Sequence, residues 1–74
     1  MKYYKTNYDY KALEDNVTSE GFYKGVGIKF HEYGVSVIYT DRWPGIASID
    51  IEIDREEFVK QLEKAQNLLK DFLK

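Results

Sequence analysis

The most constraining feature of this sequence is a continuous apolar stripe near its C-terminus. Five apolar residues recur there at alternating steps of four and three: Phe58, Leu62, Ala65, Leu69 and Phe72. That spacing places side chains on one face of an α-helix, because one turn takes 3.6 residues. Charged and amide residues fill most of the other positions between 55 and 74. The stripe predicts one amphipathic helix over about residues 55–74, which needs a second layer to cover it.

The start of this helix is marked by the sequence Asp54-Arg55-Glu56-Glu57. It is a capping-box pattern, in which the Asp54 side chain accepts from the Glu57 backbone N–H and the Glu57 side chain reaches back. Glu56 and Glu57 also suit the positive end of the helix dipole. We therefore expect the helix to begin directly after Asp54.

An alternating segment leads into this cap. Its apolar members are Ala47, Ile49, Ile51 and Ile53, and its polar members are Ser48, Asp50, Glu52 and Asp54. A period of two is typical of a strand with one buried face. The pattern predicts a strand over residues 47–53 whose isoleucines share a core with the helix.

Two further strands are predicted upstream, over residues 22–30 and 35–40. The link between them, residues 31–34, has the length of a hairpin turn, and Gly34 can supply a positive φ angle. The next link contains Trp43-Pro44-Gly45-Ile46, which favours a type II turn. Residues 22–53 are thus expected to form a three-stranded meander.

The N-terminal segment leaves two alternatives open. Alternating tyrosines favour a strand near Tyr3 to Tyr8, followed by a loop or helical turn, whereas Asp9 could instead cap a short helix through Leu13. The overall prediction is an α+β fold, in which a three- or four-stranded antiparallel β-meander is packed by one C-terminal helix. With 74 residues, the chain is expected to form a single domain.

Cysteine is absent, which excludes disulfides, Cys-zinc sites and thiol chemistry and is typical of a reducing compartment. No apolar run approaches the roughly 18 residues of a membrane span, and the first residues lack the apolar stretch of a signal peptide. We expect a cytoplasmic protein.

Little in the sequence points to catalysis. The only histidine, His31, falls in a predicted hairpin turn, and the three serines lack the glycine context of an activated nucleophile. The acidic residues have no calcium-loop spacing. We therefore expect no enzymatic activity, no cofactor and no metal site.

Gly25 and Gly27 fall on the same predicted strand face, between Tyr23 and Lys29. They leave a flat patch that another backbone or an aromatic ring could approach. Alternatively, the glycines allow the strand to bend over the helix.

The densest charge cluster lies between residues 50 and 57, where five of eight residues are acidic and only Arg55 opposes them. Alternate residues of a strand lie about 6.6–6.8 Å apart, so a row of carboxylates could imitate the phosphates of a nucleic-acid strand. Alternatively, the cluster is a solvated strand edge followed by acidic residues that suit the helix dipole. The candidate partner-binding carboxylates are Asp50, Glu52, Glu56 and Glu57.

Three other residues are candidates for partner binding. Trp43 and Arg42 are neighbours in a predicted turn, and both residue types are common in interface hot spots. Trp43 could equally cover one end of the core, with Arg42 stacked on it. Tyr23, beside the glycine pair, completes the set.

Two hypotheses about function follow. The first is a non-enzymatic interaction protein, of the kind that phages and mobile elements use as anti-CRISPR or anti-restriction inhibitors, whose acidic surface enters the basic groove of a nucleic-acid-handling enzyme. Homodimerisation is compatible with this hypothesis. The second is a single-stranded nucleic-acid-binding module that stacks bases on Tyr3, Tyr4, Tyr8 or Tyr23 with Lys5, Lys24 and Lys29 nearby. The net charge of −2 favours the first hypothesis.

Overall fold

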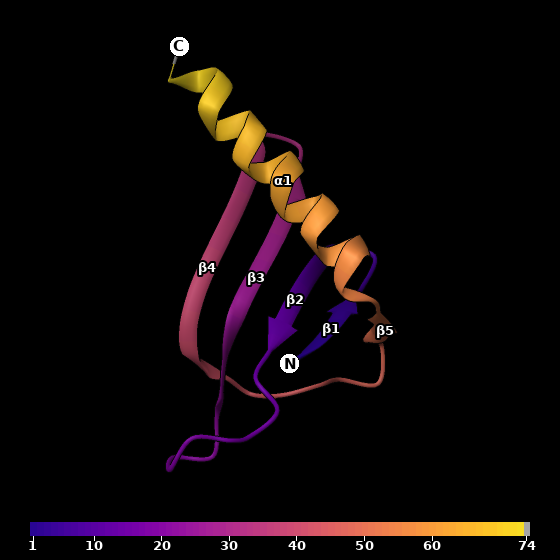
Figure 1. Cartoon of the computed structure of the whole chain (residues 1–74), viewed down its shortest axis with the longest axis vertical. Coiled ribbons are helices and arrows are strands. Elements are labelled where there is room, and N and C mark those ends of the chain that lie inside the picture. The colour runs from indigo at the N-terminus through magenta and orange to yellow at the C-terminus, as the bar shows by residue number, and fades with distance from the viewer. Residues whose placement is uncertain (74) are drawn as a thin grey trace.

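A computed structural model describes residues 1–73 and shows one antiparallel sheet with one helix packed diagonally across it (Figure 1). The elements are β1 (Lys2–Lys5), β2 (Asp9–Leu13), β3 (Tyr23–His31), β4 (Gly34–Trp43), β5 (Ile51–Ile53) and α1 (Arg55–Phe72). The strand order across the sheet is β4-β3-β2-β1-β5. The predicted α+β class and C-terminal helix are confirmed.

The N-terminal segment forms a hairpin of two strands. β1 ends at Lys5, and residues 9–13 form β2, so neither the loop nor the helical turn predicted there is present. The reason is local, because the Thr6 hydroxyl donates to the Asp9 carboxylate at 2.6 Å and accepts from the Asp9 backbone N–H at 3.1 Å. Asp9 thereby closes a turn instead of capping a helix.

The predicted hairpin between the next two strands is confirmed as β3–β4, and Gly34 in its turn has a φ of 154°. β4 is longer than predicted and continues to Trp43, which places this residue in a strand. Gly45, just beyond, also has a positive φ of 116°. Strands β1 to β4 therefore form a four-stranded meander in chain order.

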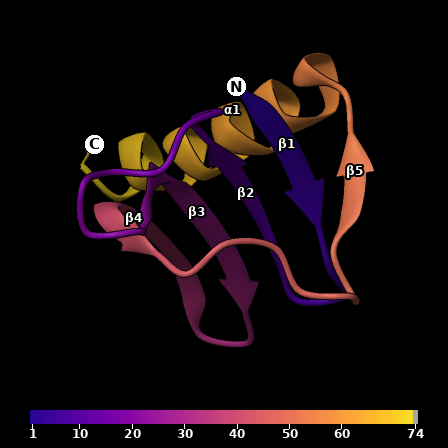
Figure 2. The same ribbon diagram turned by 90° about the horizontal axis from the view of Figure 1, so that it is seen from below.

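The last strand is not the neighbour of β4. Residues 44–50 cross the sheet on the face opposite α1 and deliver β5 to the other edge, where Glu52 pairs with Tyr4 of β1 (Figure 2). The three-stranded meander predicted over residues 22–53 is wrong at this point. The predicted strand is also shortened, since residues 47–50 form a turn in which the Asp50 N–H donates to the Ala47 carbonyl.

The main core lies between the sheet and residues 55–65 of α1. Ala12, Ile28, Phe58 and Ala65 are its buried centre. The prediction of a buried isoleucine face is wrong for Ile49 and Ile51, which are 67% and 59% exposed, and holds only for Ile53. Because β5 is a short strand at the sheet edge, it brings only its last isoleucine under the helix.

The C-terminal end of α1 extends beyond the sheet, past the end at which β3 joins β4 (Figure 1). Every residue from 66 to 73 is exposed, although Leu69 and Phe72 continue the stripe that begins with the buried Phe58. Phe72 is 85% exposed. The first three residues of the predicted apolar stripe therefore contribute to the core, and the last two are exposed on the surface.

Candidate interaction surfaces

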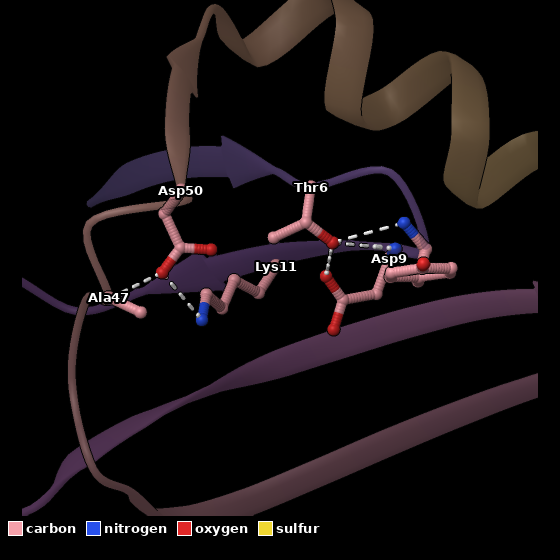
Figure 3. A network of polar contacts seen from close by, with 6 residues as sticks. Thr6, Asp9, Lys11, Ala47 and Asp50 are labelled. Carbon is pink, nitrogen blue, oxygen red and sulfur yellow. Dashed lines mark hydrogen bonds and ion pairs between the residues drawn. The ribbon is translucent and has the colours of Figure 1, made fainter.

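Asp50 is not part of an exposed acidic row. Its Oδ2 lies 3.0 Å from the Lys11 Nζ and accepts from the Ala47 backbone N–H at 2.6 Å (Figure 3). The Asp50 side chain is 1% exposed. Lys11 alternates with the core residues Tyr10 and Ala12, so it points to the face opposite α1, where the crossover lies. The buried ion pair links the crossover, residues 44–50, to β2 at the centre of the sheet.

The other acidic residues of the 50–57 cluster, which include the predicted Glu52, Glu56 and Glu57, lie around the β5 edge and the first turn of α1. We call Glu52, Asp54, Glu56 and Glu57 the acidic edge. Glu52 and Glu56 are exposed, and within residues 1–73 neither forms an ion pair. Their arrangement is not the regular row predicted for alternate residues of one strand, because β5 is only three residues long.

The other two members of the acidic edge have structural contacts. Asp54 caps α1, since its Oδ1 accepts from the Glu57 backbone N–H at 2.8 Å. The reciprocal half of the predicted capping box is replaced, because the Glu57 carboxylate lies 3.5 Å from the Lys5 Nζ. Both Glu57 and Lys5 are about 40% exposed in their side chains.

Trp43 lies on the sheet, far from the acidic edge. Its indole N–H donates to the Gly25 carbonyl at 2.9 Å, and a Cβ added to Gly27 would meet the indole ring at 2.5 Å. The ring predicted to approach the glycine patch is thus a ring of this chain. Trp43 belongs to β4 and the acidic edge adjoins β5, which are opposite edges of the sheet.

Arg42 and Tyr23 are also separated from the acidic edge. The Arg42 guanidinium pairs with the Glu20 carboxylate at 3.3 Å, and both side chains are largely exposed. Tyr23 is half-buried and faces Trp43 across the β3–β4 pair. The structure therefore places the predicted site residues in two separate groups.

The tyrosines and lysines predicted to bind single strands do not form one platform. Tyr3 packs against Phe58 on the helix side, with ring centroids 5.4 Å apart, whereas Tyr4 is buried on the opposite face. Tyr8 is 71% exposed, in the turn between β1 and β2. Lys5 is engaged by Glu57. A strand of bases has no continuous row of rings to stack on.

A second surface, which the sequence patterns did not reveal, combines the free edge of β4 with the second half of α1. We call it the β4–α1 surface, and its apolar members are Val37, Tyr39, Leu69 and Phe72. Residues 34–40 of β4 carry no charge. That uncharged run was visible in the sequence, but periodicity cannot show that its strand lies at an edge.

The part of the chain that the structure describes offers few other candidate catalytic or metal-binding groups. His31 lies with its Nε2 3.5 Å from the Ser36 hydroxyl in an exposed position. Within residues 1–73, no three His, Asp or Glu side chains gather as metal ligands would. The helix described here is not apolar enough over its length to cross a membrane.

Comparisons with protein-family models, with curated proteins and with solved structures find no match to this chain.

Proposed function

We propose that this chain is a non-enzymatic interaction protein that binds a basic surface of another protein through its acidic edge. The observation that carries the proposal is the exposure of Glu52 and Glu56, which have no ion pair within residues 1–73. Exposed carboxylates without an ion pair remain hydrated at little cost in free energy. They attract a cationic partner over a distance of about one Debye length.

The partner class that fits is a cytoplasmic nucleic-acid-handling enzyme with a basic groove, and the mode of action is inhibition, as in anti-CRISPR or anti-restriction proteins. Small size, a net charge of −2 and the absence of cysteine support this class. The class is chosen by analogy of size and charge. Because Asp50 is buried, the acidic edge would not reproduce the regular spacing of nucleic-acid phosphates. It would compete with phosphates for the basic groove through its negative charge.

Affinity capture from the source cell tests the proposal when it is quantified for matched variants. The test variant is Glu52→Gln with Glu56→Gln, and the control is Glu14→Gln with Glu63→Gln, which removes the same charge at other exposed positions. A basic protein captured by the wild type and the control should be lost from the test variant and released by added salt. Equal capture by both variants would contradict the proposal.

A fluorescence titration with single-stranded oligonucleotides at low salt provides the second arm. We expect no binding, because the sheet tyrosines lie on both faces of the sheet. Binding that weakens steeply with salt would favour the nucleic-acid-binding hypothesis instead.

A further inference from the structure

The two free edges of the sheet differ in how they are protected. β5 is three residues long and carries Glu52, and short charged edges resist pairing with other chains. β4 is ten residues long, and its segment from 34 to 40 has neither a charge nor a proline. A long uncharged edge presents unpaired N–H and C=O groups that a further strand can bind.

The C-terminal end of the helix is also uncovered. Its buried stripe ends at Ala65, and Leu69 and Phe72 continue the same face past the sheet while remaining 52% and 85% exposed. On the helix side of β4, Val37 and Tyr39 are 43% and 68% exposed. Val37 and Tyr39 of β4 thus lie on the helix side of the sheet without a helix covering them. Leu69 and Phe72 of α1 have no strand of this chain below them.

We propose that a second copy of this chain occupies the β4–α1 surface, through antiparallel pairing of the two β4 strands about a two-fold axis. A two-fold axis perpendicular to the sheet pairs an edge strand with its own copy and keeps both helices on one face. Because opposed residues share a face, odd-numbered residues pair with odd-numbered ones, and a centre near Val37 sets Val35 opposite the partner's Tyr39.

This register matches the uncovered parts of the helix and the strand. Val35 packs against the core cluster at the end of β4 where α1 leaves its own sheet. The partner's Tyr39 would therefore lie under the second half of the helix, where Leu69 and Phe72 cover it. By symmetry, the partner's helix covers Tyr39 of the first chain.

The area and the charges are compatible with a stable dimer. Phe72 and Tyr39 alone expose on the order of 300 Å² per chain, taking roughly 200 Å² for a full aromatic side chain. With Leu69, Val37 and the β4 backbone, the surface reaches roughly 500 Å² per chain, so two copies would bury about 1,000 Å² in total, the lower end of the range for a specific interface. The paired segments carry no charge, so the two copies do not repel each other at the centre.

Sedimentation velocity across a range of protein concentrations tests this proposal. We expect the wild type to have twice the mass of one chain. The single variant Val37→Lys and the double variant Leu69→Glu/Phe72→Glu should each be monomeric, with far-UV circular dichroism spectra like that of the wild type. Ile49→Lys replaces another exposed apolar residue outside this surface and should remain dimeric. A monomeric wild type at about 100 μM, or a dimeric Val37→Lys variant, would overturn the proposal.

Cross-linking provides a readout that does not depend on disruptive variants. Because the chain has no cysteine, Val37→Cys introduces a single thiol close to the two-fold axis, where Cα separations suit a disulfide. Mild oxidation should give a covalent dimer for Val37→Cys and not for Ile49→Cys. Equal cross-linking of the two variants, or higher assemblies instead of a dimer, would contradict the two-fold arrangement.

Discussion

The Nζ of Lys11 lies 3.0 Å from the Oδ2 of Asp50, and this contact joins the central strand β2 to the crossover that precedes β5. The Lys11 and Asp50 side chains are only 14% and 1% exposed. Within residues 1–73, the second oxygen of Asp50, Oδ1, is buried and has no hydrogen-bond partner. Asp50 therefore belongs to the acidic cluster in sequence, but in the structure it links the crossover to the sheet.

Breaking this pair should be costly. Asp50→Asn or Lys11→Met leaves one partner buried without its counter-charge, and we expect either to lower the free energy of unfolding by about 3 kcal/mol. The double variant should lose clearly less than the sum of the two, because neither uncompensated charge remains. Urea denaturation measures all three values, and strictly additive losses would show that the ion pair is not coupled.

The Lys5–Glu57 pair supplies the matched control. Its atoms are 3.5 Å apart, and both side chains are about 40% exposed. An ion pair this accessible is screened by water and salt, so Lys5→Met with Glu57→Gln should change the free energy of unfolding by less than about 1 kcal/mol. A loss as large as that for Asp50→Asn would mean that exposure does not decide the strength of these pairs.

Gly27 should tolerate no side chain while Trp43 is present. A Cβ at residue 27 would lie 2.5 Å from the indole ring, so Gly27→Ala must displace the ring. We expect a cost of about 1–3 kcal/mol in the free energy of unfolding and a red shift of tryptophan emission. In a Trp43→Ala background the same change should be neutral or slightly stabilising, since alanine restricts the unfolded chain. An unshifted emission spectrum would contradict the ring contact.

The cap of α1 can be tested at Asp54. Its carboxylate accepts from the Glu57 backbone N–H at 2.8 Å, so Asp54→Ala should lower the free energy of unfolding by about 1 kcal/mol. Asp54→Ser retains a side-chain acceptor and should recover most of this loss. Thermal denaturation followed at a helix-sensitive wavelength distinguishes them, and equal stability of the two variants would argue against the cap.

Asp15 provides a pH prediction. The N-terminal ammonium of Met1 donates a 2.8 Å hydrogen bond to its carboxylate, and this bond, together with the ammonium charge, holds the pKa of Asp15 below its ordinary value. A lowered folded-state pKa stabilises the fold above the unfolded value of about 3.9, and that stabilisation is lost as pH falls through the folded pKa. An NMR titration should show the lowered pKa, and acetylation of the amine should return it towards normal. An unchanged pKa after acetylation would exclude the ammonium as the cause.

Local features of the fold could be predicted from the sequence. The α1 stripe and its Asp54 cap are set by spacing within one turn, and the β3–β4 hairpin is set by alternation around Gly34. Each depends on residues that are neighbours in the chain. For that reason periodicity and turn chemistry were sufficient to predict them.

The strand order and the burial of Asp50 could not be predicted in this way. Alternation shows which residues share a face, but it does not show which strand lies beside which. Asp50 has the position of an exposed strand residue, and only the partner Lys11, far earlier in the chain, makes it a buried one. The acidic edge is smaller than predicted, and the β4–α1 surface was missed, for this same reason.

Residues 44–50 cross the sheet on the face opposite α1, so that β5 joins β1 and the outer edge of β4 stays open. Cross-strand backbone NOEs in a monomeric variant such as Val37→Lys test this strand order most directly. We predict NOEs at the Tyr4–Glu52 pair and none between β4 and residues 47–53. NOEs that join residues 47–53 to β4 would contradict this strand order, because β5 would then cover the open edge of β4 and Asp50 would be released to the surface.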